Sequence, residues 1–306
     1  MIERQGSVGG YATDTQGHHS VNGYWIEGED GLILIDAHWR LSDAQRAFEA
    51  MRTVSDKPIA AVIITHPHSD HFGGLPVFLD AAEEEGEPAE YYASAWTARS
   101  IANDEQGFLA NRRDQFGDDF PATMPQPTHL IEDGSRVTIA GVDLEFTILR
   151  QNEAVETVLI HLPAERALFT GDIVNSETLP VLYQGGLDSW IAQIYALRSH
   201  FPDVVTIFPG HGAPGNADDL IEDEIAVLEI HRDEVAAALE DDGTVDAVER
   251  EAIKDAIESR FPSWRTTAGI PARRDVIERN IDWILRGWRV DGAGEGQAAE
   301  FRTDGD

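Results

Sequence analysis

Apolar runs and alternating apolar and polar positions fill the first two thirds of the chain, and both patterns predict strands. The run IAAVIIT at 59–65 is rich in β-branched residues, which is typical of a strand buried on both faces. Residues 128–150 alternate around turns at Asp133-Gly134 and Ala140-Gly141, which predicts two or three antiparallel strands. Further strands are predicted at 20–27, 31–37, 91–94, 156–163, 166–172 and 205–212.

Helical patterns separate these strands, and they change character late in the chain. Helices are predicted at 42–54, with Ser42 as the N-cap, from Gly73 to 85, and at 95–114 and 188–200. Strands and helices therefore alternate twice, which indicates two β-rich halves with outer helices. Three further helical segments are predicted after Ala217, at 217–241, 245–260 and 273–289.

This pattern divides the chain into three expected parts. We expect one mixed α+β domain at 1–216 and helices packed on it at 217–290. The polar, glycine-rich remainder at 291–306 is acidic and is expected to be disordered. The helices at 217–290 could cover a pocket, complete the outer layer of the domain or form a homodimer interface.

Composition narrows the environment and the chemistry. There is no apolar run of membrane-spanning length, and MIERQGSVGG lacks the apolar core of a secretory signal, so we expect a cytoplasmic protein with no membrane partner. The chain has no cysteine, which excludes disulfides, thiolate metal ligands and a cysteine nucleophile. Any bound metal must therefore be held by His, Asp and Glu.

The charge is strongly one-sided. The formal net charge is −33, and Lys57 and Lys254 are the only lysines. Such a surface repels itself in dilute buffer, whereas molar salt shortens the Debye length to about 3 Å and screens the repulsion. We interpret this composition as halophilic, with an ordinary acidic protein as the alternative. The same charge argues against a nucleic-acid partner, because such binding requires neutralised phosphates.

One short motif concentrates the candidate chemistry. His66, His68, Asp70 and His71 follow the predicted strand at 59–65 and precede Gly73-Gly74. Imidazole and carboxylate groups suit zinc, iron or manganese. A loop of polar residues satisfied by ordinary hydrogen bonds is the alternative, but four ligand-type residues within six positions favour a metal site.

The motif THPHSDHFGG resembles the HxHxDH signature of the metallo-β-lactamase-fold hydrolases, over roughly residues 5–216. That resemblance implies an α+β, four-layer αββα sandwich with two metal ions at one end, followed here by a C-terminal helical extension. The first metal would bind His66 and His68, and the second Asp70 and His71. The family's bridging Asp matches Asp172 in ALFTGD.

Three further positions are assigned through the same resemblance. The family's late His, a ligand of the second metal, matches His211 in FPGHG. Asp36 in LILIDA matches an early Asp that supports the metal-site loops without binding metal. Many members have a third His on the first metal, but the corresponding position holds Glu153 in this chain. His161 lies too far along, in the following predicted strand, and His129 lies well upstream in a strand-like run, so neither is expected to replace it.

Glu153 resembles the glutamate ligand of the alkylsulfatase branch of the superfamily. Two histidines and a glutamate form an accepted catalytic zinc set. That branch consists of longer enzymes and tends to use Glu where this chain keeps Asp172. The alternative for Glu153 is an exposed acid in a very acidic protein.

This resemblance implies a metal-dependent hydrolase with a dinuclear site. Two divalent ions, zinc by default and iron or manganese as alternatives, would activate a bound hydroxide to attack a small-molecule ester. Asp70 would act both as ligand and as catalytic proton acceptor. A lactone, carboxylic ester, thioester or sulfate ester fits this chemistry. The alternatives are a mononuclear iron oxygenase of the same fold and a non-catalytic binding or effector protein that retains the fold.

Overall fold

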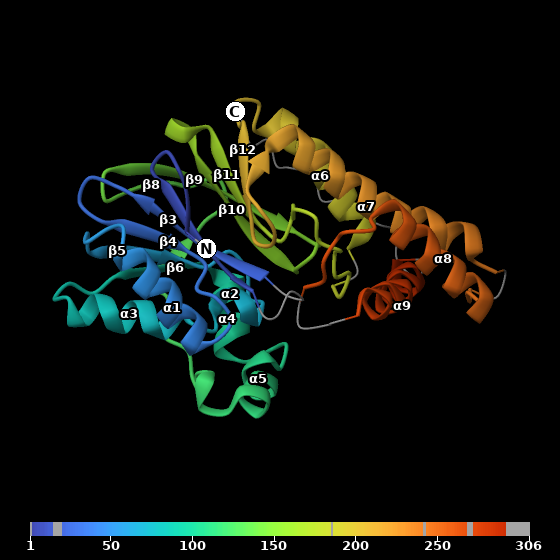
Figure 1. The fold of residues 1–306 in the computed structure, drawn as a ribbon, viewed down its shortest axis with the longest axis horizontal. Helices are drawn as coiled ribbons and strands as arrows, with labels where there is room; N and C mark the ends of the chain where they lie inside the picture. The colour runs from blue at the N-terminus through green and yellow to red at the C-terminus, as the bar shows by residue number, and fades with distance from the viewer. Residues whose placement is uncertain (1, 15–19, 185, 241–242, 268–271, 292–306) are drawn as a thin grey trace.

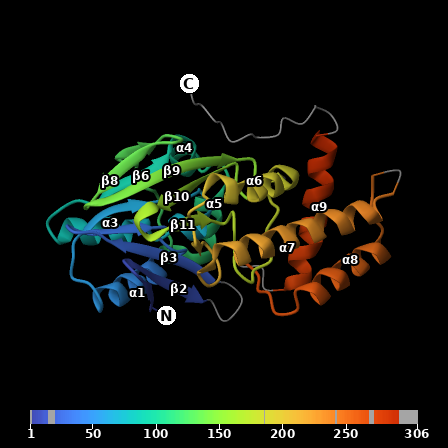
Figure 2. The same ribbon diagram turned by 90° about the horizontal axis from the view of Figure 1, so that it is seen from above.

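The computed structural model describes residues 2–14, 20–184, 186–240, 243–267 and 272–291 (Figure 1). Within this part of the chain the strands form two sheets that face each other, and helices cover both outer faces (Figures 1 and 2). The expected α+β sandwich with a C-terminal helical extension is therefore confirmed. Residues 292–306 of the expected tail lie outside the described residues.

The first sheet has seven strands in sequence order. Its first four strands pair antiparallel and its last four, beginning again with β4, pair parallel. Parallel neighbours need crossover connections, and helices supply them here. The strands are β1 (Ile2–Gln5), β2 (Val8–Asp14), β3 (Ser20–Glu27), β4 (Leu32–Ile35), β5 (Ile59–Ile63), β6 (Glu90–Ser94) and β7 (His129–Ile131). The β-branched run of β5 lies in the middle of the parallel part, as a doubly buried strand should.

The second sheet has six strands in the order β13-β12-β11-β10-β9-β8. Only β11 and β12 pair parallel, and helix α6 (Leu187–His200) connects them. The strands are β8 (Arg136–Ile139), β9 (Val142–Arg150), β10 (Glu156–Leu162), β11 (Ala167–Gly171), β12 (Thr206–Pro209) and β13 (Gly215–Asn216). A 3-10 turn, η2 (Pro163–Glu165), joins β10 to β11.

Helices pack on both outer faces of the sandwich. The first sheet is accompanied by α1 (Leu41–Arg52), α2 (Ser69–Phe72), α3 (Leu75–Glu84), α4 (Ala95–Ala102), α5 (Phe108–Phe116) and the 3-10 turn η1 (Gly117–Asp119). The second sheet is accompanied by α6 and by the C-terminal helices α7 (Ala217–Ala238), α8 (Ala247–Arg260) and α9 (Arg273–Asp291). No helix of the described residues is both long enough and apolar enough to cross a membrane.

Three apolar cores hold the layers together. One lies between the sheets and includes Ile63, Phe146 and Phe169. A second joins the first sheet to α1 and α3, and a third joins the second sheet to helices α6 to α9. The C-terminal helices thus share a core with the second sheet, through residues such as Leu228 and Ile281. The boundary that we place after residue 216 remains a prediction.

Several local expectations were wrong for identifiable reasons. Strands β1 and β2 were missed because their glycine-rich, polar sequence lacks alternation. Strand β7 pairs parallel with β6 in the first sheet, so it does not belong to the antiparallel group predicted at 128–150. Ser42 lies inside α1 and its hydroxyl donates to Asp119, so it is not the N-cap. The helix predicted at 95–114 is interrupted at Gly107, where φ is +70°.

Candidate metal centre

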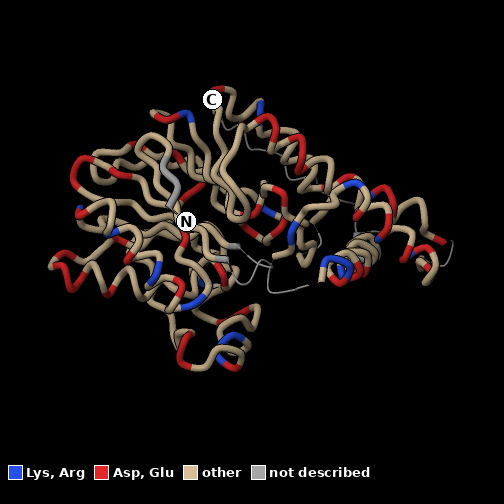
Figure 3. The backbone as a smooth tube through the Cα atoms, viewed as in Figure 1, with Lys and Arg blue, Asp and Glu red and all other residues tan. Residues whose placement is uncertain are grey.

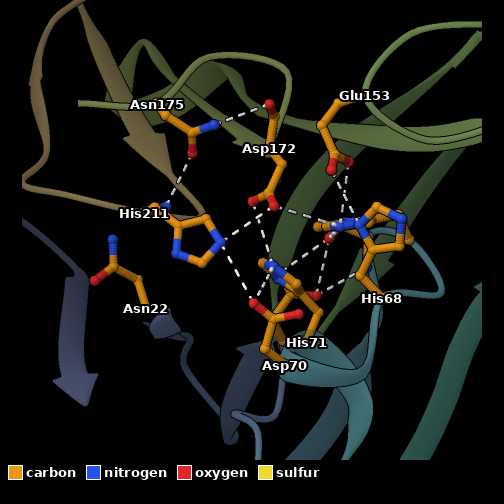
Figure 4. Close-up of polar contacts among 12 residues, drawn as sticks. Asn22, His68, Asp70, His71, Glu153, Asp172, Asn175 and His211 are labelled. Atoms are coloured by element: carbon orange, nitrogen blue, oxygen red, sulfur yellow. Dashed lines mark hydrogen bonds and ion pairs between the residues drawn. The ribbon is translucent and has the colours of Figure 1, made fainter. Parts of the chain in front are cut away.

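The candidate residues are brought together by the ends of strands and by the loops that follow them. The HPHSDH motif follows β5, Asp172 follows β11, His211 follows β12, and Glu153 lies in the loop between β9 and β10 (Figure 4). Two glycines allow the motif to pack closely, because a Cβ on Gly73 would lie 1.9 Å from the carbonyl oxygen of Trp39 and one on Gly74 2.2 Å from that of Ala37. All seven predicted ligands therefore converge at one edge of the sandwich.

Four of these side chains form a first group, consisting of His66, His68, Glu153 and Asp172, all buried. His68 Nδ1 lies 3.1 Å from Glu153 Oε1, and His66 Nε2 lies 3.7 Å from Glu153 Oε2. His66 Nε2 is also 3.7 Å from Asp172 Oδ2. Glu153 is only 5% exposed, so it is not the exposed acid that the sequence left open.

Asp70, His71 and His211 form a second buried group beside the first. Asp70 Oδ2 is 3.5 Å from His211 Nε2 and 3.8 Å from His71 Nε2. Asp172 connects the two groups, because its Oδ1 lies 3.3 Å from His71 Nε2 and its Oδ2 lies 3.1 Å from His211 Nε2 (Figure 4). A carboxylate placed between two ligand sets is the arrangement expected of a bridging ligand.

The chemistry of these donors fits divalent metal ions. Four buried atoms have no hydrogen-bond partner among the described residues: His66 Nε2, His71 Nε2, Glu153 Oε2 and Asp172 Oδ1. A buried polar atom without a partner normally costs about 1–3 kcal/mol, so a cluster of them that faces one point calls for a bound group. Imidazole nitrogen and carboxylate oxygen atoms suit zinc, iron or manganese.

Without metal, the buried imidazoles and carboxylates of the site shift each other's pKa values. Burial alone would raise the pKa of Asp172, but His211 and His71 outweigh it and hold that pKa well below its usual range. Burial alone would lower the pKa of His71, but Asp172 and Asp36 raise it well above its usual value. The site without metal therefore favours protonated imidazole beside carboxylate, and metal ions would take the place of those protons.

Asp36 and Thr65 orient the imidazole rings from behind. Asp36 Oδ2 accepts a hydrogen bond from His71 Nδ1 at 2.8 Å, and the Thr65 hydroxyl donates to the same carboxylate. His66 Nδ1 lies 2.9 Å from that hydroxyl oxygen, which is left to accept its proton. Both rings are thus fixed as Nδ1–H tautomers, with Nε2 free to bind a metal. This is the supporting role that the resemblance implied for Asp36.

Sequence reasoning missed several residues that support the second group. The Asn175 amide accepts a hydrogen bond from the His211 backbone N–H at 3.2 Å and donates one to the Asp172 carbonyl oxygen at 3.1 Å (Figure 4). The Asn175 backbone N–H donates to Glu224 Oε2 at 2.8 Å, and Glu224 is fully buried on α7. Burial raises the pKa of Glu224 well above its usual value. The signal in the sequence was Glu224 itself, because an acidic residue on the otherwise mostly apolar face of a helix indicates a buried hydrogen-bond partner.

The loop after Asp172 is also attached to the other C-terminal elements. Leu179 N–H donates to the carbonyl oxygen of Arg265 at 2.9 Å, and the backbone N–H of Arg265 donates to the carbonyl oxygen of Glu177 at 2.8 Å. On α9, Asn280 accepts a hydrogen bond from Leu182 N–H and donates to the Pro180 carbonyl oxygen. The C-terminal helices therefore hold the loop that follows Asp172.

Two histidines that were weighed against Glu153 lie elsewhere. His161 pairs with Glu145 on the neighbouring strand, at 3.1 Å. His129 stacks on the ring of Tyr92, with 4.6 Å between ring centroids. Neither belongs to the two groups of candidate ligands, which favours Glu153 for the third position on the first metal.

Comparison with known proteins agrees with the fold. The family described as "Metallo-beta-lactamase superfamily" matches residues 17–211. The linear primary-alkylsulfatase of Pseudomonas sp. (strain ATCC 19151) is 26% identical over 242 residues, which cover 69% of this chain and 44% of that enzyme. The chain thus spans less than half the length of this relative.

Solved structures show the same fold. A double mutant of the sec-alkylsulfatase PisA1 from Pseudomonas sp. aligns with a TM-score of 0.67 and 22% identity, and covers 94% of this chain and 49% of its own. A metallo-β-lactamase from Pontibacter korlensis aligns with a TM-score of 0.59 and 20% identity, and covers 75% of this chain and 98% of its own. The likeness to the sulfatase therefore extends into the C-terminal helices.

Proposed function

The chain belongs to the metallo-β-lactamase superfamily, and from that premise we propose that it is a dinuclear metal-dependent hydrolase of small ester-type substrates, with an alkyl sulfate as the preferred class. The observation that carries the proposal is the convergence of two buried ligand groups that share Asp172. A mononuclear iron oxygenase would need only one of these groups. A non-catalytic relative would be expected to have lost part of one.

The residues divide into holding and proton-transfer roles. His66, His68 and Glu153 would hold the first metal, Asp70, His71 and His211 the second, and Asp172 would bridge both. Bound divalent cations, zinc by preference, supply an activated water and charge that stabilises the transition state. Asp70 is the proposed proton acceptor, because its carboxylate lies at this edge between the imidazoles of His71 and His211.

Two features support a sulfate monoester over the other esters that the sequence left open. Glu153 occupies the position that a third His takes in many relatives, and its carboxylate lies against His68 and His66. The relative compared above by sequence is a linear primary-alkylsulfatase. Lactones, carboxylic esters and thioesters remain the substrates to compare with it.

Metal analysis followed by a substrate panel tests the proposal. We expect purified protein, loaded with zinc and dialysed, to hold close to two ions per chain, and to hydrolyse a medium-chain alkyl sulfate faster than a matched lactone, thioester or phosphate ester. Asp172→Ala should lose metal and activity together. One iron per chain with oxygen consumption would favour the oxygenase, and full metal content without hydrolysis of any ester would favour a binding protein.

We also propose that the protein works at molar salt, as in the cytoplasm of a halophile. Figure 3 shows acidic residues on all layers of the fold and only scattered basic ones. Because these charges are exposed and repel each other, salt should stabilise the native state. The midpoint of thermal unfolding should rise steeply between 0.1 M and 2 M KCl. A midpoint that does not change with salt would contradict this interpretation.

A further inference from the structure

Arg112, on helix α5, is attached directly to the metal-binding motif. Its Nε donates to the hydroxyl of Ser69 at 3.1 Å, and Ser69 lies between His68 and Asp70 in HPHSDH. Its Nη1 donates to Gln115 at 2.8 Å, and its guanidinium carbon lies 5.1 Å from the centre of the Trp39 ring. Three contacts thus fix the plane of the guanidinium beside the candidate metal centre.

The guanidinium of Arg112 has no carboxylate partner among the described residues, although the chain is strongly acidic. Acidic residues outnumber basic ones by 56 to 23. The adjacent Arg113 pairs with Asp118, and Arg99 on α4 pairs with Glu105. No carboxylate oxygen of the described residues lies within ion-pair distance of Arg112, and its Nη2 has no partner among them. Three N–H groups of this half-buried cation, two of them on Nη2, are therefore left for a ligand.

The surroundings of Arg112 strengthen its attraction for an anionic ligand. Burial lowers the pKa of Arg112, and only the charge of Asp70 opposes that shift. An arginine remains charged even so, and a partly desolvated cation gains more from an anion than one in water does. The planar fork of N–H groups matches two oxygen atoms of an oxyanion.

Helix α5 also brings an apolar group to the same turn. Phe108 lies one helical turn before Arg112, and residues so spaced share a helix face. Its ring meets the ring of His68 edge-on, with 5.5 Å between centroids. The helix thus presents a cation and an aromatic ring to the HPHSDH turn. That pairing suits a molecule with an anionic head and an apolar remainder.

We propose that Arg112 is an anion-binding residue of the substrate site, and that it takes the sulfate head of a sulfate monoester beside the HPHSDH turn. This inference rests on the proposed function, because it specifies the substrate class of that site. Trp39 and Ser69 act as positioning residues, since they hold the guanidinium and leave its Nη2 edge open.

Sulfate binding tests the inference separately from catalysis. The zinc-loaded protein is titrated with sodium sulfate in a calorimeter, at constant ionic strength in KCl. We expect Arg112→Gln to weaken sulfate binding by about tenfold or more, as the loss of a charge-assisted hydrogen-bond pair requires. Arg112→Lys should weaken it less, because it keeps the charge and loses the fork. Arg99→Gln is the matched control and should leave the affinity unchanged.

Two further measurements make each outcome decisive. Zinc content must stay the same in Arg112→Gln; loss of zinc would mean that Arg112 only supports Asp70, which overturns the inference. Equal sulfate affinity in Arg112→Gln and the wild type would also overturn it. Sulfate binding that requires Arg112 without hydrolysis of any sulfate ester would support the inference and contradict the proposed function. Alkyl sulfate hydrolysis with an unchanged KM in Arg112→Gln would do the reverse.

Discussion

Asp36→Asn is expected to weaken metal binding although Asp36 is not a ligand. The Asp36 carboxylate accepts hydrogen bonds from Thr65 N–H at 2.9 Å, from the Thr65 hydroxyl at 2.9 Å and from His71 Nδ1 at 2.8 Å. In asparagine the amide oxygen can keep the bond to Thr65 N–H, but the NH2 group would then face the His71 Nδ1–H. Two donors in contact repel, so His71 should turn or move its proton to Nε2, where a metal would bind.

The backbone makes asparagine the appropriate replacement. Asp36 has φ of +59°, in the left-handed region that Asn tolerates better than most residues do. The substitution therefore changes hydrogen bonding and charge with little added backbone strain. The side chain is 4% exposed, so water does not replace the lost acceptor.

The magnitude follows from the kind of bond that is lost. A hydrogen bond to a charged group contributes about 1.5–3 kcal/mol, and loss of an outer partner of a ligating histidine typically costs 10–100-fold in metal affinity or activity. These two ranges agree, since each factor of ten is about 1.4 kcal/mol. We expect the loss to fall on the second metal, because His71 belongs to the second group of ligands.

Competition with a chromophoric chelator measures the two zinc affinities, and elemental analysis after dialysis gives the zinc content. Asp36→Asn should hold close to one zinc per chain where the wild type holds two. Asp43→Asn is the matched control, because Asp43 is 1% exposed but pairs with Arg40 and Arg46. It should lower stability and leave zinc affinity unchanged. The tautomer argument fails if Asp36→Asn retains both zinc ions at wild-type affinity.

Three further predictions concern the ligands and their support. Glu153→Ala should lose the first metal. An unchanged metal content, measured by elemental analysis, would mean that Glu153 is not a ligand of the first metal. Zinc binding should release protons and strengthen as pH rises, because the pKa of His71 is raised in the metal-free protein, chiefly by Asp172 against the effect of burial; calorimetry in buffers of different ionisation enthalpy counts the protons. The raised pKa of His71 and the lowered pKa of Asp172 together mean that this pairing stabilises the metal-free fold fully between about pH 4 and pH 6.5; the contribution is lost as pH rises through the folded-state pKa of His71 and as pH falls through that of Asp172. Glu224→Ala should lower the free energy of unfolding by about 1–3 kcal/mol and weaken zinc binding through Asn175, whereas Glu224→Gln, which keeps an acceptor, should stay near the wild type in chemical unfolding.

The sequence alone determined most of the strands and helices and named the residues of the candidate site. Strand β5 was predictable because its run of buried β-branched residues leaves no polar face. The HPHSDH motif could be named because four ligand-type residues cluster directly after a predicted strand, and Asp172 and His211 could be named because the short motifs ALFTGD and FPGHG resemble those of the metallo-β-lactamase-fold hydrolases. Local pattern and spacing carry that information within a short stretch of chain.

Other features were decided only by the tertiary structure. Glu153 in a very acidic chain could be a ligand or a surface acid, and only its burial against His68 and His66 separates the two. Strand β2 pairs with the edge that β3 offers, and β1 pairs in turn with β2, which their own sequence does not reveal.

The supporting contacts depend on distances that no local pattern encodes. Asn175 connects Asp172 and His211 with Glu224 on α7, and Arg112 reaches Ser69 from a helix far along the chain. Hydrogen bonds of this kind act over about 3 Å, whereas the residues that form them are separated by tens of positions. Sequence patterns report the neighbours along the chain, and the packing of two sheets and their helices determines which side chains meet.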